Sequence, residues 1–581
     1  MNLFADIRLL VIAKLDELVG EGALPADLSF DAVTVEPPRD AAHGDMATNA
    51  AMALAKQAKT NPRALATLLA EKLSTDPRIT AADIAGPGFI NLRLAPDLWM
   101  QTISAAVSAG DGFGRSTLGS DKRVNVEFVS ANPTGPLHVG HTRGAVFGDA
   151  LAGLLAFAGW DVTREYYIND GGAQVDVLAR SVHLRYQEAH GRDIQIVEGL
   201  YPGDYLIPVG KALKDAHGDA FLDKPEGEWL ETVRNFATDA MMALIRDDLA
   251  ALNVTMDKFY SEKSLYGEGR IEAALASLDA KGLIYEGYLE PPKGKLPEDW
   301  EAREQTLFKA TAYGDDVDRP VKKSDGGWTY FAPDIAYHFD KVERGYDLLI
   351  DVFGADHGGY VKRLKAAVAA LSAEKTPLEI KLTSMVKLFK DGAEFKMSKR
   401  SGSFVTLRDL IDEVSADVVR FTMLTRKNDM PFDFDFNKAL DQSKDNPVFY
   451  VQYAHARICS VLRSAAEQGI ACDDAALAGA DLGSLDHDAW AELARKVAEW
   501  PRLIETAART QEPHRVAFYL YDLAGVFHAL WNKGREVPEL RFLQDSDPAG
   551  TPARLAAIRA VSVVISAGLG ILGVTPATEM R

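Results

Sequence analysis

The stretch from Val124 to Trp160 constrains the fold more than any other part of this 581-residue chain. Val124, Val126 and Phe128 alternate with polar residues, which is typical of a β-strand, and the run then breaks at the loop NPTGP. From residue 142 onward, apolar residues recur at helical spacing. A strand, a loop and a helix N-terminus in this order direct unpaired backbone N–H groups at one point, which predicts an anion site near residues 138–141.

Two histidines stand at the predicted helix start, in the run HVGH. His138 and His141 are three residues apart, so they lie on one face, where both can donate hydrogen bonds to phosphate oxygens. Gly140 leaves room for a base or a ribose close to the backbone. Ordinary helix caps contain patterns as short as this one, so the four residues alone leave both interpretations open.

A second cluster follows 258 residues later (396 minus 138), in the run FKMSKRSG. Lys396, Lys399 and Arg400 make it cationic, and the turn Lys390-Asp391-Gly392 before it is typical of a hairpin. Alone, such a cluster is most often a solvated basic turn. The two motifs together are far more specific than either one.

HVGH followed at this distance by KMSKR resembles the signature of class I aminoacyl-tRNA synthetases. The flanking runs resemble the arginyl members of that family: EFVSAN at 127–132, GADHGGY at 354–360, and the long block at 433–458. The resemblance extends from Gly44 to Arg581. It implies ATP-dependent activation of L-arginine and its transfer to the terminal adenosine of tRNA(Arg).

The resemblance and the residue patterns agree on an α/β fold with three domains. Residues 1–114 show helix, turn, helix and strand patterns, as in the α+β domain that the family uses against the tRNA elbow. Residues 115–440 predict a doubly wound, parallel, Rossmann-like catalytic domain, interrupted by a charged, Pro-rich connecting insertion at about 191–326. Residues 441–581 are helical almost throughout, as in the family's anticodon-binding bundle.

Adenylation needs positioning and preorganised positive charge rather than a covalent enzyme intermediate. The resemblance assigns catalysis to His138, His141, Lys396 and Lys399. It implies that ATP, carried as its Mg²⁺ complex, contacts Pro133, Gly135, His138, Gly140, His141, Lys396, Met397, Ser398 and Lys399. We expect no dedicated protein cage for the metal. Two cysteines, Cys459 and Cys472, predict neither a structural zinc site nor a disulfide framework.

Arginine recognition calls for carboxylates that match the planar guanidinium group. The resemblance implies that arginine contacts Glu127, Asn132, Glu262, Tyr330, Asp334 and Asp356. A site that pairs a buried carboxylate with its substrate rejects analogues strongly, so we expect no editing activity in the insertion. Measured hydrolysis of mischarged tRNA that depends on the insertion would contradict this.

The candidate tRNA contacts in the C-terminal bundle are Tyr453, Arg457, Trp531 and Arg535, because RNA loops are read by stacking on aromatic rings and on arginine planes. For the aromatic residues a core position is the competing interpretation. The formal net charge of −20 is the wrong sign for a generic nucleic-acid binder, so local basic faces must carry any tRNA contact. We expect no DNA partner.

The apolar run 9–13 is short and flanked by charges, which predicts an amphipathic helix rather than a signal peptide. The apolar tract 560–574 is shorter than the ~20 residues of a membrane span and predicts a buried helix. Neither feature directs the protein to a membrane, so we expect it in the cytoplasm. The resemblance implies a monomer.

Three alternatives remain open from the sequence. A class I synthetase of another specificity could share both motifs, although a cysteinyl enzyme would need zinc-binding thiols that this chain lacks. A nucleotidyltransferase acting without tRNA could use HVGH but would have no need for the helical tail. The third is a catalytically inactive RNA-binding paralogue. Amino-acid-dependent pyrophosphate exchange separates all of these.

Overall fold

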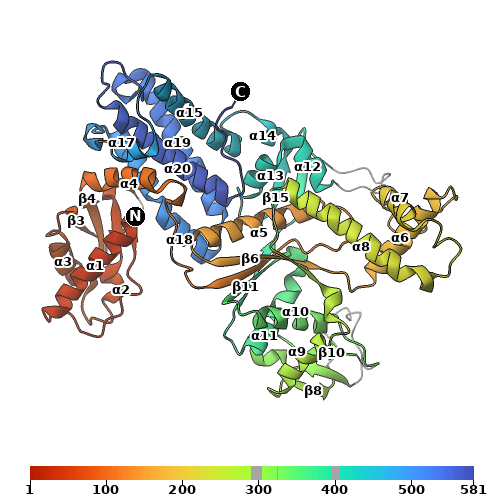
Figure 1. Cartoon of the computed structure of the whole chain (residues 1–581). Coiled ribbons are helices and arrows are strands. Elements are labelled where there is room, and N and C mark those ends of the chain that lie inside the picture. Colours follow the sequence, from red (N-terminus) through yellow and green to blue (C-terminus); the bar gives the residue numbers. More distant parts are fainter. Residues whose placement is uncertain (39, 290–303, 324, 396–404, 581) are drawn as a thin grey trace.

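A computed structural model describes residues 1–38, 40–289, 304–323, 325–395 and 405–580 (Figure 1). The catalytic sheet lies at the centre of the molecule. The N-terminal unit and the C-terminal helical bundle lie side by side on one side of the sheet, and helices α6 to α8 project on the other. The overall class is α/β with an all-helical C-terminal part, as the sequence predicts.

The N-terminal unit is a four-stranded antiparallel sheet covered by helices. Its strand order is β1-β2-β4-β3, and all three pairings are antiparallel. The amphipathic helix predicted at the N-terminus is confirmed as α1. The elements are α1 (Leu3–Gly20), β1 (Val35–Glu36), β2 (Met46–Thr48), α2 (Ala50–Leu54), α3 (Pro62–Leu73), β3 (Ile79–Ala85) and β4 (Phe89–Leu94).

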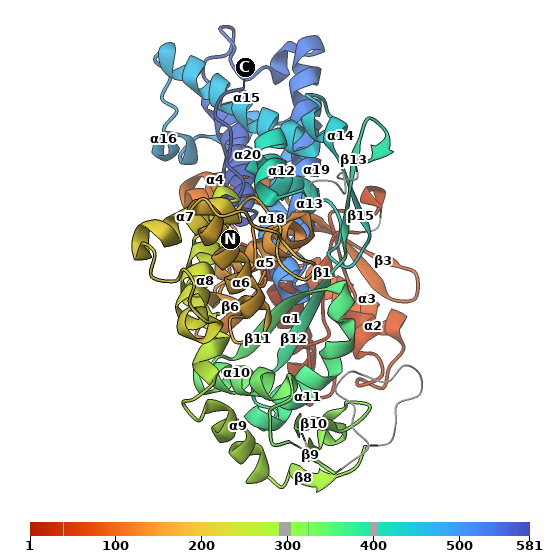
Figure 2. The ribbon, with the colours of Figure 1, turned by 90° about the vertical axis from the view of Figure 1, so that its right-hand side faces the viewer.

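The central sheet has five parallel strands in the order β12-β11-β5-β6-β7. Helix α5 lies on one face, and α10 and α11 lie on the other (Figures 1 and 2). The strands are β5 (Arg123–Glu127), β6 (Asp161–Ile168), β7 (Lys258–Ser261), β11 (Leu348–Gly354) and β12 (Leu378–Thr383), and the helices are α5 (Val139–Phe157), α10 (Phe331–Glu343) and α11 (Val361–Ser372). This confirms the predicted doubly wound sheet and places the ends of β5, β6, β7 and β11 at one edge.

The segment 191–326 differs from the uninterrupted insertion that the sequence predicts. Strand β7 lies inside it and pairs with β6 as the fifth strand of the main sheet. Four residues are too few to show a strand periodicity within a highly charged stretch. Helix α6 (Gln174–Ala189) precedes this segment. Around β7 the segment contains α7 (Leu206–His217), α8 (Glu226–Ala251), α9 (Arg270–Asp279) and a small antiparallel sheet of β8 (Ile284–Gly287), β9 (Gln305–Phe308) and β10 (Arg319–Lys322).

A small three-stranded sheet and two short helices flank residues 396–404. Strands β13 and β14 form the predicted hairpin, whose turn residues Asp391 and Gly392 have φ of 54° and 76°. Two short helices, α12 and α13, follow residues 396–404. The elements are β13 (Val386–Lys390), β14 (Ala393–Glu394), α12 (Leu407–Val414), α13 (Ala416–Met423), β15 (Phe432–Asp435) and α14 (Phe436–Leu440).

The C-terminal part is a helical bundle, and helix α4 (Pro96–Ala109) packs into it against three of its members. The bundle consists of α15 (Pro447–Glu467), α16 (Asp474–Ala478), α17 (Asp488–Ala498), α18 (Trp500–Thr510), α19 (His514–Glu536) and α20 (Thr551–Ile571). In the part of the chain that the structure describes, α20 alone is long and apolar enough to cross a membrane. It is mostly buried inside the bundle.

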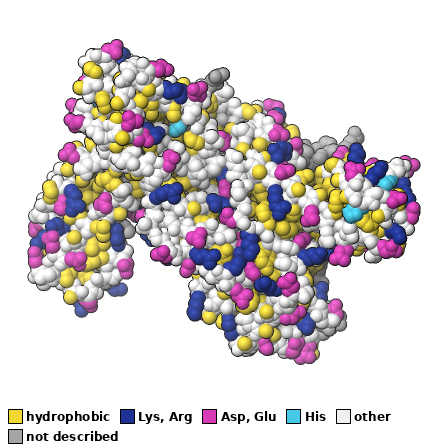
Figure 3. Space-filling model, viewed as in Figure 1, with side chains coloured by type: hydrophobic (Ala, Val, Ile, Leu, Met, Phe, Trp, Pro, Cys, Tyr) yellow, Lys and Arg dark blue, Asp and Glu magenta, His cyan; other side chains and the backbone are white. Residues whose placement is uncertain are grey.

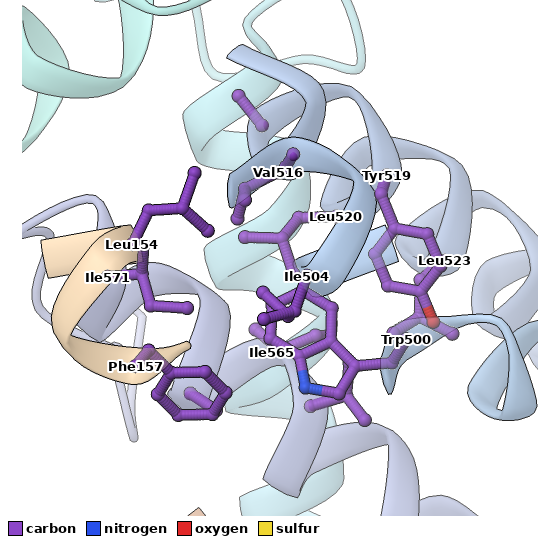
Figure 4. Packing of buried hydrophobic residues seen from close by; sticks show 14 of the residues in the cluster. Leu154, Phe157, Trp500, Ile504, Val516, Tyr519, Leu520, Leu523, Ile565 and Ile571 are labelled. Carbon is purple, nitrogen blue, oxygen red and sulfur yellow. The ribbon is translucent and has the colours of Figure 1, made fainter. Parts of the chain in front are cut away.

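Helix α5 joins the catalytic sheet to the bundle. Its C-terminal half carries Leu154 and Phe157, which pack against Trp500 of α18 and Ile571 of α20 (Figure 4). At Gly153 an added Cβ would lie 2.7 Å from the carbonyl oxygen of Ile571, so only glycine permits this close approach. The N-terminal end of α5 therefore carries HVGH, and its C-terminal half packs against the bundle.

Candidate active site

The HVGH run forms the N-terminus of α5, and the two histidine rings cap it. The Nδ1 atom of His138 accepts from the backbone N–H of Gly140 at 3.0 Å. The Nδ1 atom of His141 accepts from the backbone N–H of His138 at 3.3 Å, and the rings stack at 3.8 Å. With Nδ1 acting as the acceptor in both rings, the proton sits on Nε2, which is the donor atom that a phosphate needs.

Both histidines are neutral in the folded protein. Burial lowers the pKa of His138, and burial together with the charge of His138 lowers the pKa of His141 to about 4. They are therefore neutral N–H donors, and the positive potential at this point comes from the helix N-terminus. At Gly140 an added Cβ would lie 2.7 Å from Cε1 of His138, so glycine at this position leaves room for the histidine ring that caps the helix.

The loop between β5 and α5 is held in an unusual conformation. Val129 and Ser130 have φ of 70° and 40°, a left-handed backbone that is rare for a β-branched residue and is found at functional sites. The Ser130 hydroxyl donates to Oε1 of Glu127 at 2.9 Å and accepts from the backbone N–H of Tyr167 at 3.1 Å. Ser130 therefore orients the Glu127 carboxylate and ties β5 to β6.

The predicted ATP residues Pro133 and Gly135 lie farther along this loop. Pro133 is buried, and the Tyr205 hydroxyl donates to the carbonyl of Thr134 at 2.8 Å. An added Cβ at Gly135 would lie 3.0 Å from the Tyr205 oxygen. The insertion therefore supports the loop from outside, a contact that the sequence did not indicate.

The two signature motifs meet through backbone hydrogen bonds. The N–H of Val139 donates to the carbonyl of Val405 at 3.1 Å, and the N–H of Leu407 donates to the carbonyl of Leu137 at 2.8 Å. His138 and Thr406 thus form an antiparallel bridge. Lys396, Met397, Ser398 and Lys399 lie outside the described residues, but the chain that follows them is paired directly to HVGH.

Arg143 secures the same junction through its side chain. It is 2% exposed, and its guanidinium donates to the Ser384 hydroxyl, to the Met430 carbonyl at 2.7 Å and to the Lys427 carbonyl at 2.8 Å. These partners lie beside β13 and β15. The sequence analysis did not select Arg143; its only signal was a charged residue within a helix whose neighbours are apolar.

Three predicted arginine contacts form a cluster of carboxylates, in which Glu127 and Glu262 are buried and Asp334 is half-buried. Glu127 ends β5, Glu262 begins the 3-10 helix η3 (Glu262–Leu265) after β7, and Asp334 lies in the first turn of α10. Burial, with further contributions from Glu262 and Glu127, raises the pKa of Asp334 to about 7, although nearby His338 opposes the shift. Burial likewise raises the pKa of Glu262. A cluster of this kind favours a cationic ligand, which would relieve the crowding of like charges.

Two tyrosines lie beside this cluster, and the sequence analysis did not identify either. The ring of Tyr167, at the end of β6, packs against that of Tyr337 with centroids 4.4 Å apart and planes tilted by 38°. Burial, reinforced by the charges of Glu262, Asp334 and Glu127, raises the pKa of Tyr167 well above the usual value. The Tyr266 hydroxyl donates to Oε1 of Glu262 at 3.1 Å. The available signal was topological, because the end of β6 meets the end of β5 at the same sheet edge.

The other predicted arginine contacts lie at exposed positions outside the carboxylate cluster. Asn132 is exposed and hydrogen bonded to Asn169 at 3.0 Å and to Gln174 at 2.7 Å. Tyr330 precedes α10 and is 78% exposed. Asp356 lies in the 3-10 helix η5 (Ala355–Tyr360), where its Oδ2 atom is 3.5 Å from Nε2 of His357. The structure therefore does not bring Asp356 into the carboxylate cluster.

The candidate tRNA contacts lie together on the bundle. The Arg457 guanidinium is 4.1 Å from the Tyr453 ring centroid and 4.7 Å from that of Trp531, and it donates to the Tyr453 hydroxyl at 2.9 Å. Tyr453 and Arg457 line a cavity of about 400 Å³, and Trp531 and Arg535 line another of about 510 Å³. All three of Tyr453, Arg457 and Trp531 are partly exposed, so they are not simply core residues.

Comparisons with known proteins agree along the whole chain. Residues 5–94 match the arginyl tRNA synthetase N terminal domain, residues 102–458 match the catalytic domain of class I (R) tRNA synthetases, and residues 451–580 match the DALR anticodon binding domain. The catalytic match alone covers more than half of the chain.

Individual relatives and a solved structure point the same way. The chain is 70% identical over 580 residues to the arginine--tRNA ligase of Ruegeria sp. (strain TM1040) and 68% identical over 581 residues to that of Paracoccus denitrificans, each covering 100% of both proteins. The Thermus thermophilus arginyl-tRNA synthetase structure superposes with a TM-score of 0.73 at 21% identity, covering 100% of each chain, and so shows the shared fold. The chain therefore belongs to the arginyl-tRNA synthetases of class I.

Proposed function

We propose that this chain activates L-arginine with ATP and transfers it to the terminal adenosine of tRNA(Arg). In the first step an oxygen of the arginine carboxylate attacks the α-phosphorus of ATP and diphosphate leaves. In the second step a ribose hydroxyl of the tRNA attacks the acyl carbon, and AMP leaves. Full-length relatives with the name arginine--tRNA ligase support this, and the carboxylate cluster of Glu127, Glu262 and Asp334 is the observation that carries it.

The carboxylate cluster gives each end of arginine a partner. Asp334 and Glu262 suit the guanidinium, whose N–H groups match carboxylate oxygens. Glu127 and Asn132, nearer to HVGH, suit the α-amino group, which places the substrate carboxylate toward the start of α5. Tyr330 covers the guanidinium end from the rim, and Asp356 remains an exposed candidate contact. A neutral analogue such as citrulline would leave two acids unpaired.

The start of α5 suits the phosphates of ATP. The Nε2–H groups of His138 and His141, together with the helix N-terminus, stabilise charge that develops on the α-phosphate. Lys396 and Lys399 approach the β- and γ-phosphates from the segment that follows Phe395. ATP enters as its magnesium complex, with Pro133, Gly135, Gly140, Met397 and Ser398 lining its site. In the described residues no group of three or more His, Cys, Asp or Glu could hold a metal.

The tRNA would span the bundle and the N-terminal unit. The cavities around Arg457 fit unstacked bases, because the guanidinium and the rings of Tyr453 and Trp531 provide stacking surfaces. Figure 3 shows Lys and Arg side chains gathered over the middle of one face, near β6 and β11, on a protein whose net charge is −20. We propose a monomer, as the family resemblance implies, and a place of action in the cytoplasm.

The test is ATP–pyrophosphate exchange with arginine, lysine or glutamate, each with and without tRNA. We expect exchange with arginine alone, and only when tRNA is present. Asp334→Asn should abolish it, whereas Glu343→Gln, on the exposed side of the same helix, should not. Exchange with lysine or glutamate would support the alternative of a different specificity, and no exchange under any condition would contradict the proposal.

A further inference from the structure

A buried histidine lies behind the carboxylate cluster, in contact with the residues that hold it. His338 is 3% exposed and lies on α10, one turn after Asp334. Its Nδ1 atom lies 2.7 Å from the carbonyl oxygen of Asp334, and its Nε2 atom lies 2.9 Å from Oδ2 of Asp351 on β11. Both ring nitrogens therefore face oxygen atoms.

The chemistry of these contacts determines the protonation state of the ring. A backbone carbonyl can only accept, so Nδ1 must carry a proton. Nε2 must then either carry a second proton or accept one from a protonated Asp351. The second choice is unfavourable, because Oδ1 of Asp351 also accepts from the buried ammonium group of Lys341 at 2.9 Å, which stabilises the carboxylate. The ring is therefore an imidazolium.

The charges around His338 balance only if it is charged. It faces Asp351 on β11, Glu127 on β5, and Lys341 and Asp334 on its own helix, and Lys341 also binds Glu127 at 2.5 Å. Two cations and two carboxylates thus form a neutral set, which leaves Asp334 and Glu262 to the substrate. Burial opposes the charge on the ring, but Asp351 outweighs it, so the pKa of His338 is raised.

We propose that His338, as an imidazolium, is the positioning residue that sets Asp334 for arginine by fastening the first turn of α10 to β11. The proposal rests on the proposed function. It predicts that loss of the ring charge weakens arginine binding more than it slows the chemistry, because His338 touches the helix that carries a substrate contact and not the reacting atoms.

The direct test is nitrogen NMR of the wild-type protein with ¹⁵N-labelled histidine. The His338 resonances are assigned as those lost in His338→Gln, or by site-selective labelling if that variant does not fold. We expect both ring nitrogens to be protonated at pH 8, whereas His183 should be neutral, because its Nε2 faces the Phe221 carbonyl at 3.1 Å and burial lowers its pKa. A single protonated nitrogen at His338 at pH 8 would overturn the proposal.

The kinetic test uses the KM for arginine as a function of pH. For His338→Gln we expect a KM raised about 10-fold with kcat within about 3-fold of wild type. In the wild type, the KM for arginine should rise at alkaline pH, because the ring loses its charge. The ratio of variant to wild-type KM should therefore fall as the pH rises. The amino group of the substrate titrates equally for both proteins, so it does not affect this ratio.

A ratio of variant to wild-type KM that stays constant across pH would show a merely structural role for His338 and would contradict the proposal. His183→Gln, which replaces a buried histidine on α6, is the matched control and should leave KM unchanged. If the wild-type protein shows no arginine activity, the proposed function fails. The NMR measurement still tests the charge of His338 in that case.

Discussion

At the scale of single residues, the charge of Asp334 destabilises the folded protein. Its pKa is about 7 in the folded protein, above the ordinary value of 3.8, so ionisation disfavours folding. The cost is absent near pH 4, grows between pH 4 and 7, and is constant above pH 7. We expect Asp334→Asn to raise the Tm by roughly 2–4 °C at pH 8 and hardly at all at pH 4.5.

Thermal unfolding followed by circular dichroism at both pH values measures the change in Tm. Glu343→Gln serves as the control and should leave the Tm unchanged, since it removes an exposed charge from the same helix. An equal gain for Asp334→Asn at pH 8 and at pH 4.5 would mean that the carboxylate is not strained by its neighbours.

His141 is a second residue whose charge state makes a prediction. With a pKa of about 4 it stays neutral throughout the working range, so it contributes a hydrogen bond and no titratable charge. We expect His141→Asn to lower the rate of adenylate formation by about 10²-fold. The ratio of the two rates, measured by single-turnover kinetics, should be constant from pH 5.5 to 8.5, and a ratio that decreases as the pH rises would indicate a cationic ring instead.

At the scale of elements, the junction between α5 and the sheet of β13, β14 and β15 depends on Arg143. Its planar guanidinium reaches several oxygen acceptors at once, which a lysine cannot do. We expect Arg143→Lys to raise the KM for ATP by about 10-fold, since partners that flank the lysine motif lose their anchor. Arg115→Lys, at an exposed position over Phe157, is the control, and an unchanged KM for ATP in Arg143→Lys would show that backbone pairing alone holds the junction.

At the scale of the whole molecule, Arg420 connects the catalytic domain to the end of the bundle. It is fully buried and donates to the carboxylate of Asp149 on α5, to the carbonyl of Leu572 at 2.7 Å and to that of Leu252 at 2.9 Å. Arg420→Met should lower the free energy of unfolding by about 3–5 kcal/mol, because it leaves the two carbonyls without this donor and reduces the pairing of Asp149 to its contact with Arg164 at 3.1 Å.

Urea unfolding measures the loss, and the double variant Asp149→Asn with Arg420→Met provides the check. Removing the Asp149 carboxylate, which lacks Arg420 in the single variant, should restore at least ~1 kcal/mol of the free energy of unfolding. If the double variant is no more stable than the single one, the pairing with Asp149 contributes little, and the carbonyl contacts account for the effect.

The sequence determined what is local or repeated along the chain. Periodicity located β5, α5, α1 and the helices of the bundle, because a strand or helix shows its buried face every two or every three to four residues. Family motifs supplied the candidate residues of the nucleotide and arginine sites. The sequence pattern did not reveal β7, whose four residues are too few to establish a period.

Only the tertiary structure decided which distant side chains share a charge environment. Glu127, Glu262 and Asp334 are separated by many residues, and their crowding arises where the strand ends meet α10. The neutral state of His141, the charge of His338 and the anchoring role of Arg143 likewise depend on burial and on partners from other elements. A pKa or a hydrogen-bond partner is a property of the environment that folding creates, so the order of residues alone could not specify it.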